Sequence, residues 1–390
     1  LQQCATWLAS IDSMSTAEGP DENSAYWNKV PDLDAFRKSL GQLLLRSSRA
    51  EPTFSADYLQ RVTDSGRIRD GAFRDIVGFS PILAQSLPHS LVELSLAFLR
   101  EELPDDRVVR EKQELRRTAE WRKAVLAKPE PQRTRRERVA LSSAPSLRTI
   151  GDFSYHDWER LSIHNDYQSF WPPSPLREPF HSLFQSSPDT ALRLLRELCN
   201  HAISAWRQLH RHSRERRGTP IPLELTFPWG TQRFWGTDRE YLWFRSTWAP
   251  HAISCGFMAL EEWCFAELAR SRPVDELIQQ IVRGNECIAI LGVASMLALH
   301  TETVSETTLP LFTSQRLLAA DHNRFGQDLS PSASLMGFTH RNDKPHIEAI
   351  QVANARPVRK TELSWMVPGF IFGSMPFPVE IDFSTNMTLG

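Results

Sequence analysis

The chain has 390 residues, a formal net charge of −2, 41% hydrophobic residues and 10% aromatic residues. This length allows two or three compact units or one elongated body, and the apolar fraction is sufficient for a large core. The near-zero charge excludes a protein that binds nucleic acid through its bulk charge, so a local basic stretch has to be judged separately.

Cysteine spacing and hydropathy indicate the compartment. The five cysteines are odd in number and far apart, unlike the disulfide framework of a small secreted protein, which favours reduced thiols in the cytoplasm. No run of 18 apolar residues occurs, so we expect no transmembrane helix and no membrane partner. The chain begins at Leu1 without a basic or apolar leader, and we expect it to be a piece of a longer polypeptide.

Residues 1–105 are predicted to form an N-terminal helical segment. Leucines and phenylalanines recur at helical spacing in short stretches, which Gly66, Gly78, Pro88 and Pro104 interrupt. Ser55 is predicted to cap the helix that contains Leu59. Short helices joined by Gly/Pro turns predict an all-α fold of stacked helical hairpins, with a HEAT- or armadillo-like solenoid as one arrangement.

Residues 106–150 are predicted to form a basic helix and a linker. Residues 107–138 contain twelve Lys/Arg and five Glu, and their apolar residues are sparse. One interpretation is a solvated helix followed by a Pro-interrupted linker. The alternative is a contact with nucleic acid or an acidic partner, although only Trp121 is available there to stack on a base. The candidate basic contacts are Arg116, Arg117, Arg122, Lys123, Arg133, Arg135 and Arg136.

Residues 151–325 are predicted to form an aromatic-rich helical domain. Eight of the twelve tryptophans lie between Trp158 and Trp263. Pro188 begins one long predicted helix, another begins near Pro250, and the apolar run Cys287–Leu299 is expected to be enclosed by other helices. The segment 326–390 is predicted to be irregular or short-stranded.

The connector between the two long helices, residues 220–245, has two interpretations. Leu223, Leu225 and Phe227 alternate, which predicts an extended segment lying on the helices, and the following aromatic residues are typical of a loop anchored to a core. The alternative is a recognition surface in which arginines flank exposed aromatic rings. Its candidate contact residues are Arg233, Trp235, Arg239, Trp243 and Arg245.

Motifs for common chemistries are absent from the sequence. It contains no G-x-x-x-x-G-K-[ST] loop, no G-x-G-x-x-G, no C-x-x-C, no H-E-x-x-H and no G-x-S-x-G. We therefore predict no catalytic residue, no metal ligand and no cofactor site in this chain, with ATP possible only in a missing part of the protein. An enzyme of unrecognised type would require His156, Asp157 and His164 to line one cleft.

The order of segments in the second half resembles a known family. The segments are FHSLFQSSPDTALRLLRELCNHA, FPWGTQRFWGTDREYLWFR, FMALEEWCFAELA, GNECIAILGVASMLAL and LPLFTSQRLLAAD. Over about residues 150–325 they resemble the helical region of large bacterial STAND-type ATP-binding proteins of anti-phage defence. The resemblance implies a helical sensor or scaffold whose NTPase module lies elsewhere, and it assigns no functional residue here.

The leading hypothesis is therefore a non-enzymatic scaffold or ligand-sensing region of a larger bacterial ATP-dependent protein. Its partner would be another protein or a neighbouring NTPase module, and partner binding would shift a packed helical array. The alternatives are a nucleic-acid-binding module that uses the basic stretch and an enzyme of unrecognised type.

Overall fold

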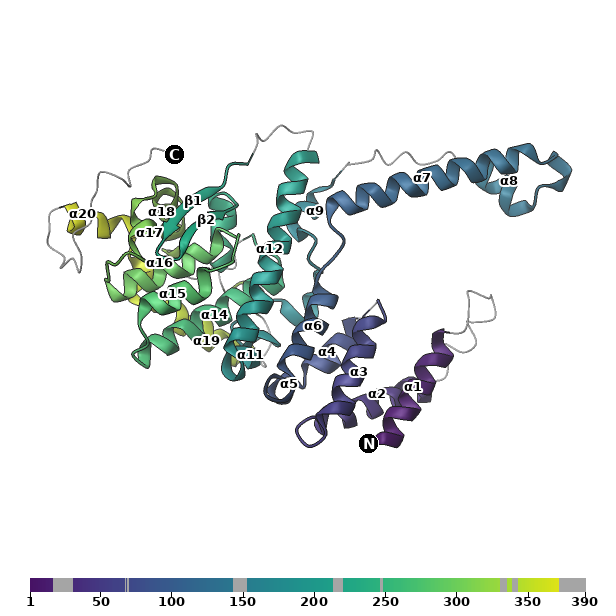
Figure 1. The fold of residues 1–390 in the computed structure, drawn as a ribbon, viewed down its shortest axis with the longest axis horizontal. Coiled ribbons are helices and arrows are strands. Elements are labelled where there is room, and N and C mark those ends of the chain that lie inside the picture. Colours follow the sequence, from purple (N-terminus) through teal and green to yellow (C-terminus); the bar gives the residue numbers. More distant parts are fainter. Residues whose placement is uncertain are drawn as a thin grey trace.

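The computed structural model describes residues 1–16, 31–66, 68, 70–142, 153–212, 220–245, 248–329, 335–338 and 343–371. Within these ranges it contains twenty α-helices and one two-stranded sheet, which confirms the predicted all-α class (Figure 1). The helices stack from the N-terminal end to the C-terminal end, and one long helix projects from the stack. A regular solenoid repeat stays a prediction.

The N-terminal helices follow the proline pattern of the sequence. Proline occupies one of the first two positions of the third, fifth and sixth helices, where its missing N–H costs nothing. The predicted cap at Ser55 is wrong, because the helix begins at Pro52 and Ser55 is buried inside it, donating to the Leu44 carbonyl at 2.6 Å. These helices are α1 (Gln2–Thr16), α2 (Pro31–Arg46), α3 (Pro52–Asp64), α4 (Asp70–Val77), α5 (Ser80–Ser86) and α6 (Pro88–Leu99).

The central body is built around one long amphipathic helix, α12, which begins at Pro188 as predicted. Helix α16 has every residue from Ala289 to Leu299 buried, as expected for a helix that is apolar all round. The elements of this part are α9 (Tyr155–Arg160), α10 (Tyr167–Phe170), α11 (Phe180–Ser186), α12 (Pro188–His212), α13 (Asp238–Tyr241), η3 (Leu242–Arg245), α14 (His251–Ala269), α15 (Val274–Val282), α16 (Ala289–Thr301), α17 (Leu309–Thr313) and α18 (Gln315–Asp328).

The aromatic connector contains a β-hairpin. Strand β1 (Leu223–Phe227) is the predicted extended segment, and it pairs antiparallel with β2 (Gly230–Phe234). The register places Leu223 opposite Phe234 and Phe227 opposite Gly230, whose φ of +119° suits glycine at a tight turn. The side chains of Leu223, Leu225 and Phe227 are buried, so the hairpin covers the core with one face.

The segment after residue 325 is more helical than predicted. It contains α19 (Lys344–Asn354), η6 (Pro357–Lys360), η7 (Leu363–Trp365) and α20 (Met366–Ile371). Val358 and Leu363 are buried in the same hydrophobic cluster as the central helices, and this tertiary packing orders a sequence that has little periodicity of its own. Residues 372–390 lie outside the described part of the chain.

The main hydrophobic cluster runs from Leu45 to Met366 and joins the N-terminal helices, the central body and the C-terminal helices. The domain boundaries expected near residues 105 and 325 therefore do not interrupt the core. Packing is close, since a Cβ added at Gly292 of α16 would overlap the ring of Phe244. Among the described residues, no helix has both the length and the hydropathy needed to span a membrane.

Candidate functional site

The element that leaves the body is the arm, residues 104–142, which comprises α7 (Pro104–Ala127), η2 (Glu130–Gln132) and α8 (Arg135–Ser142). Helix α7 has proline at its first position and Asp105 and Asp106 in its first turn, and it ends just before Pro129. At about 1.5 Å per residue its 24 residues extend for about 36 Å. Only three of these residues are buried: Pro104, Val108 and Val125. Most of the arm is therefore surrounded by solvent (Figure 1).

The tip of the arm folds back on itself. Lys128 pairs with Glu137 of α8 at 2.6 Å, and Arg122 donates to the Leu141 carbonyl at 2.9 Å. Arg133 donates to two backbone carbonyls of the turn at 3.0 Å each. Arg122 and Arg133, both predicted contact residues, therefore hold the tip together.

Several other cations of the arm are exposed. Among the predicted contacts, the side chains of Arg116, Arg117, Lys123 and Arg135 are exposed and have no hydrogen-bond or ion-pair partner among the described residues, and Arg136 is exposed as well. Sequence reasoning missed two further exposed cations, Lys112 and Arg138, which have no partner in the part of the chain that the structure describes. Lys112 had a detectable signal: at 100° per residue, positions 112, 116 and 123 fall within about 40° on one face of α7.

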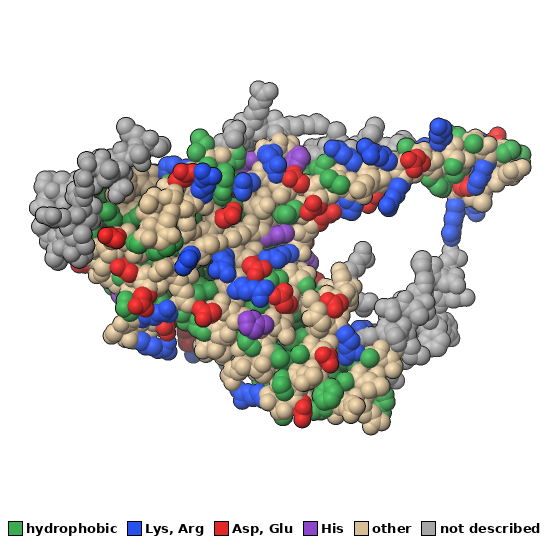
Figure 2. Space-filling model, in the orientation of Figure 1, with side chains coloured by type: hydrophobic (Ala, Val, Ile, Leu, Met, Phe, Trp, Pro, Cys, Tyr) green, Lys and Arg blue, Asp and Glu red, His purple; other side chains and the backbone are tan. Residues whose placement is uncertain are grey.

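Charge is distributed unevenly between the arm and the body. The arm, residues 104–142, contains twelve Lys/Arg and seven Asp/Glu, a net charge of +5, which leaves −7 on the rest of the chain. Lys and Arg side chains lie along the whole length of the arm in Figure 2. In the body, by contrast, many arginines are paired with carboxylates, for example Arg100 with Glu197 at 2.7 Å.

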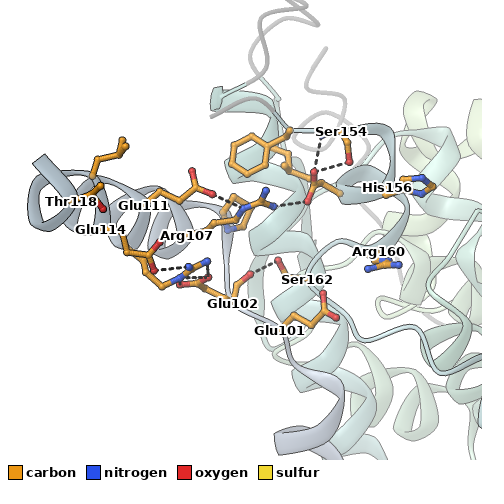
Figure 3. A pocket seen from close by; sticks show the side chains of 16 residues that line it. Glu101, Glu102, Arg107, Glu111, Glu114, Thr118, Ser154, His156, Arg160 and Ser162 are labelled. Carbon is orange, nitrogen blue, oxygen red and sulfur yellow. Dashed lines mark hydrogen bonds and ion pairs between the residues drawn. The ribbon is translucent and has the colours of Figure 1, made fainter. Parts of the chain in front are cut away.

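A cavity of about 790 Å³ lies at the root of the arm (Figure 3). Arg107 donates to Glu111 at 3.1 Å and to Asp157 at 2.8 Å, and its guanidinium lies 5.4 Å from the ring centre of Phe153. Its neighbour Arg110 pairs with Glu102 and Glu114. Five carboxylates and three arginines line this cavity, so it keeps a net negative charge. The ion pair of Arg107 with Asp157 fixes the direction of α7 relative to α9.

The enzyme hypothesis required His156, Asp157 and His164 to share one cleft. His156 and Asp157 line the root cavity, whereas His164 does not. The Asp157 carboxylate is already used, because Oδ1 accepts from Arg107 and Oδ2 accepts from the Ser154 backbone N–H at 2.7 Å and its hydroxyl at 3.0 Å. His156 is 75% exposed and bonds to Glu159. The three residues therefore do not form an acid–base arrangement.

His164 instead connects the N-terminal helices to the body. Its Nδ1 lies 3.3 Å from Glu101, its Nε2 lies 3.1 Å from Asp70 of α4, and its ring packs edge-on against Phe98. The hydrogen bond with Glu101 raises the pKa of His164 above its ordinary value, with a further contribution from Asp70 that opposes the effect of burial.

This raised pKa predicts a pH-dependent stability. A group whose pKa is higher in the folded state stabilises the fold fully below its unfolded pKa, and the contribution is lost as pH rises through the folded pKa. We expect the urea midpoint of the protein to exceed that of His164→Gln by a margin that decreases as the pH rises from mildly acidic to mildly alkaline. A difference between the two midpoints that stays the same at every pH in this range would contradict the prediction.

The five residues predicted as an aromatic contact surface do not form one surface. Trp243 is 1% exposed, because η3 packs against α14 and α16, and Arg245 is turned inward to pair with Asp328 at 2.7 Å. For these two residues the surface interpretation is wrong and the core interpretation is right. The half-buried ring of Trp235 lies under the guanidinium of Arg207, 4.0 Å away.

The remaining two residues lie apart. Arg233 is exposed on β2 and pairs with Glu224 at 2.7 Å. Arg239 stacks over Trp248, 4.5 Å from its ring centre, beside a cavity of about 390 Å³. Trp248 is 56% exposed and has a φ of +63°, and no sequence pattern identified it, because it lies in an irregular turn before α14.

Metal-binding geometry was not found within the described ranges, where no group of three or more His, Cys, Asp or Glu side chains is placed to hold an ion. Cys255 and Cys264 lie buried on α14, and burial raises the pKa of the Cys255 thiol to about 12. Such a thiol is inert as a nucleophile at neutral pH.

Comparisons with known proteins add no assignment. No family model matches the chain, and no curated protein matches it. Function is therefore inferred from the arm, the root cavity and the body.

Proposed function

We propose that this chain is a non-enzymatic recognition scaffold, in which a helical body presents the basic arm to an anionic partner. The observation that carries the proposal is the set of exposed cations that have no partner among the described residues, on an element that leaves the core: Lys112, Arg116, Arg117, Lys123, Arg135 and Arg138. The ion pairs at the root support it, because a contact element held in one direction loses less entropy on binding.

We further propose that the scaffold belongs to a larger bacterial ATP-dependent protein of the STAND type, as the resemblance of residues 150–325 implies. The cysteine pattern favours the cytoplasm as its location. ATP would then bind to an NTPase module outside this chain. The pair of half-buried Arg239 and exposed Trp248 is the candidate contact for that module or for a protein partner, since tryptophan and arginine dominate binding energy in protein interfaces.

Heparin chromatography of two variants with identical net charge tests the role of the arm. Arg116→Glu/Lys123→Glu reverses two cations of the arm, and Arg283→Glu/Lys360→Glu reverses two exposed cations of the body that also have no partner among the described residues. We expect the arm variant to elute at clearly lower salt than the body variant. Equal elution of the two variants would refute the proposal, because retention would then follow net charge and not the arm.

A further inference from the structure

We infer that the arm binds double-stranded nucleic acid through its phosphates, an inference that rests on the proposed function and names its anionic partner. The contact residues are the stripe of Lys112, Arg116 and Lys123 on α7, together with Arg135 and Arg138 at the tip. All five are exposed and have no partner among the described residues.

The spacing of the stripe fits a duplex. Arg116 and Lys123 are separated by a rise of about 10 Å along the helix axis, and the whole stripe spans about 16 Å. The major groove of B-form DNA is about 12 Å wide, so a helix lying across it places cations near the phosphates of both strands. Arg116, with its planar fork of donors, suits a phosphate oxygen pair.

The charge balance of the arm favours a polyanion. Glu114 and Glu137 are neutralised by Arg110 and Lys128. Three carboxylates of the described arm have no hydrogen-bond or ion-pair partner: Asp106, Glu120 and Glu130. The acidic body would repel nucleic acid, but a helix about 36 Å long exceeds the Debye length of about 8 Å at physiological salt. The arm can therefore contact a duplex while the acidic body stays too far away for its charge to repel the phosphates.

An acidic protein fits the arm less well. Protein interfaces close around a buried apolar or aromatic centre. The exposed apolar residues of α7 are spread over different faces, with Leu115 and Leu126 on one and Trp121 on another, so they offer no such centre. A single strand is also disfavoured, because single-strand binders interleave several aromatic rings with their cations, and Trp121 is the only aromatic residue between 107 and 138.

The test measures binding of the full chain to a short, labelled DNA duplex of mixed sequence by fluorescence anisotropy at several salt concentrations. With five phosphate contacts, the slope of log affinity against log salt is expected to be about −4.5. Arg116→Ala/Lys123→Ala is expected to weaken binding at least about tenfold at low salt and to reduce the slope by about 1.8. The control Arg283→Ala/Lys360→Ala is expected to leave both unchanged.

Several results would overturn the inference. They are no binding at low salt, an affinity insensitive to salt, an equal loss in the control variant, and tighter binding of labelled poly-glutamate than of the duplex, which would assign the arm to an acidic protein. Tighter binding of the single strand would overturn it as well. If heparin retention depends on the arm and the duplex does not bind, only this inference fails and the proposed function stands. Circular dichroism of each variant verifies its fold.

Discussion

Replacing Asp321 with alanine is expected to lower the free energy of unfolding by about 3–5 kcal/mol, because it leaves a buried arginine without its main counter-ion. Asp321 and Arg324 of α18 are both 0% exposed. The two Asp321 oxygens accept from Arg324 Nε at 2.9 Å and Nη2 at 2.8 Å, from the Tyr241 hydroxyl at 3.1 Å and from the Leu363 backbone N–H at 2.7 Å.

The same cluster fastens the C-terminal helices to the body. Arg324 also donates to the carbonyl of Arg359 in η6 at 3.1 Å, and the buried guanidinium of Arg359 pairs with Glu261 of α14. Burial lowers the pKa of Arg359 to about 10, and the negative charge of Glu261 opposes this effect. Loss of Asp321 is therefore expected to release η7 first, with faster hydrogen exchange at the Leu363 amide.

The matched control for Asp321→Ala is Glu224→Ala, which removes the exposed partner of Arg233. Its side chain is 50% exposed and that of Arg233 is 69% exposed, so its loss is expected to cost about 0–1 kcal/mol. Urea denaturation of both variants measures the difference. Similar midpoints for the two variants would contradict this prediction, because the buried and the exposed ion pair would then contribute equally to the free energy of unfolding.

The sequence predicted the helices well where periodicity and proline agree, as at Pro188 of α12 and in the apolar run of α16. It did not predict the helices after residue 343, because their order comes from burial of residues such as Val358 and Leu363 against distant helices. The second strand of the hairpin was missed for a related reason: Gly230–Phe234 pairs with β1 but lacks an apolar alternation of its own.

The candidate sites were predictable to different degrees. A run of cations with few apolar residues marks a solvated helix, so the basic stretch of the arm was visible in the sequence. The direction in which the arm leaves the body depends on the ion pair of Arg107 with Asp157, which is far along the chain. The aromatic connector was ambiguous because a tryptophan beside an arginine occurs both in cores and on contact surfaces. Only the packing separates Trp243, which is buried, from Trp248, which is exposed.

That difference predicts opposite outcomes for two tryptophan variants. Trp243→Ala is expected to lower the free energy of unfolding by about 3–5 kcal/mol, because it opens a large cavity between α14 and α16. Trp248→Ala removes an exposed ring and its stacking with Arg239, which is expected to cost about 0.5–1 kcal/mol. Urea denaturation of the two variants, followed by circular dichroism, measures both effects.

An equal loss in the two variants would contradict this placement of the rings. The result also decides how binding data on this connector should be interpreted. Because Trp243 is in the core, a loss of partner binding in Trp243→Ala would follow from partial unfolding and would not locate a contact. A loss of binding in Trp248→Ala at unchanged stability would locate one, because that ring is exposed and supports little of the core.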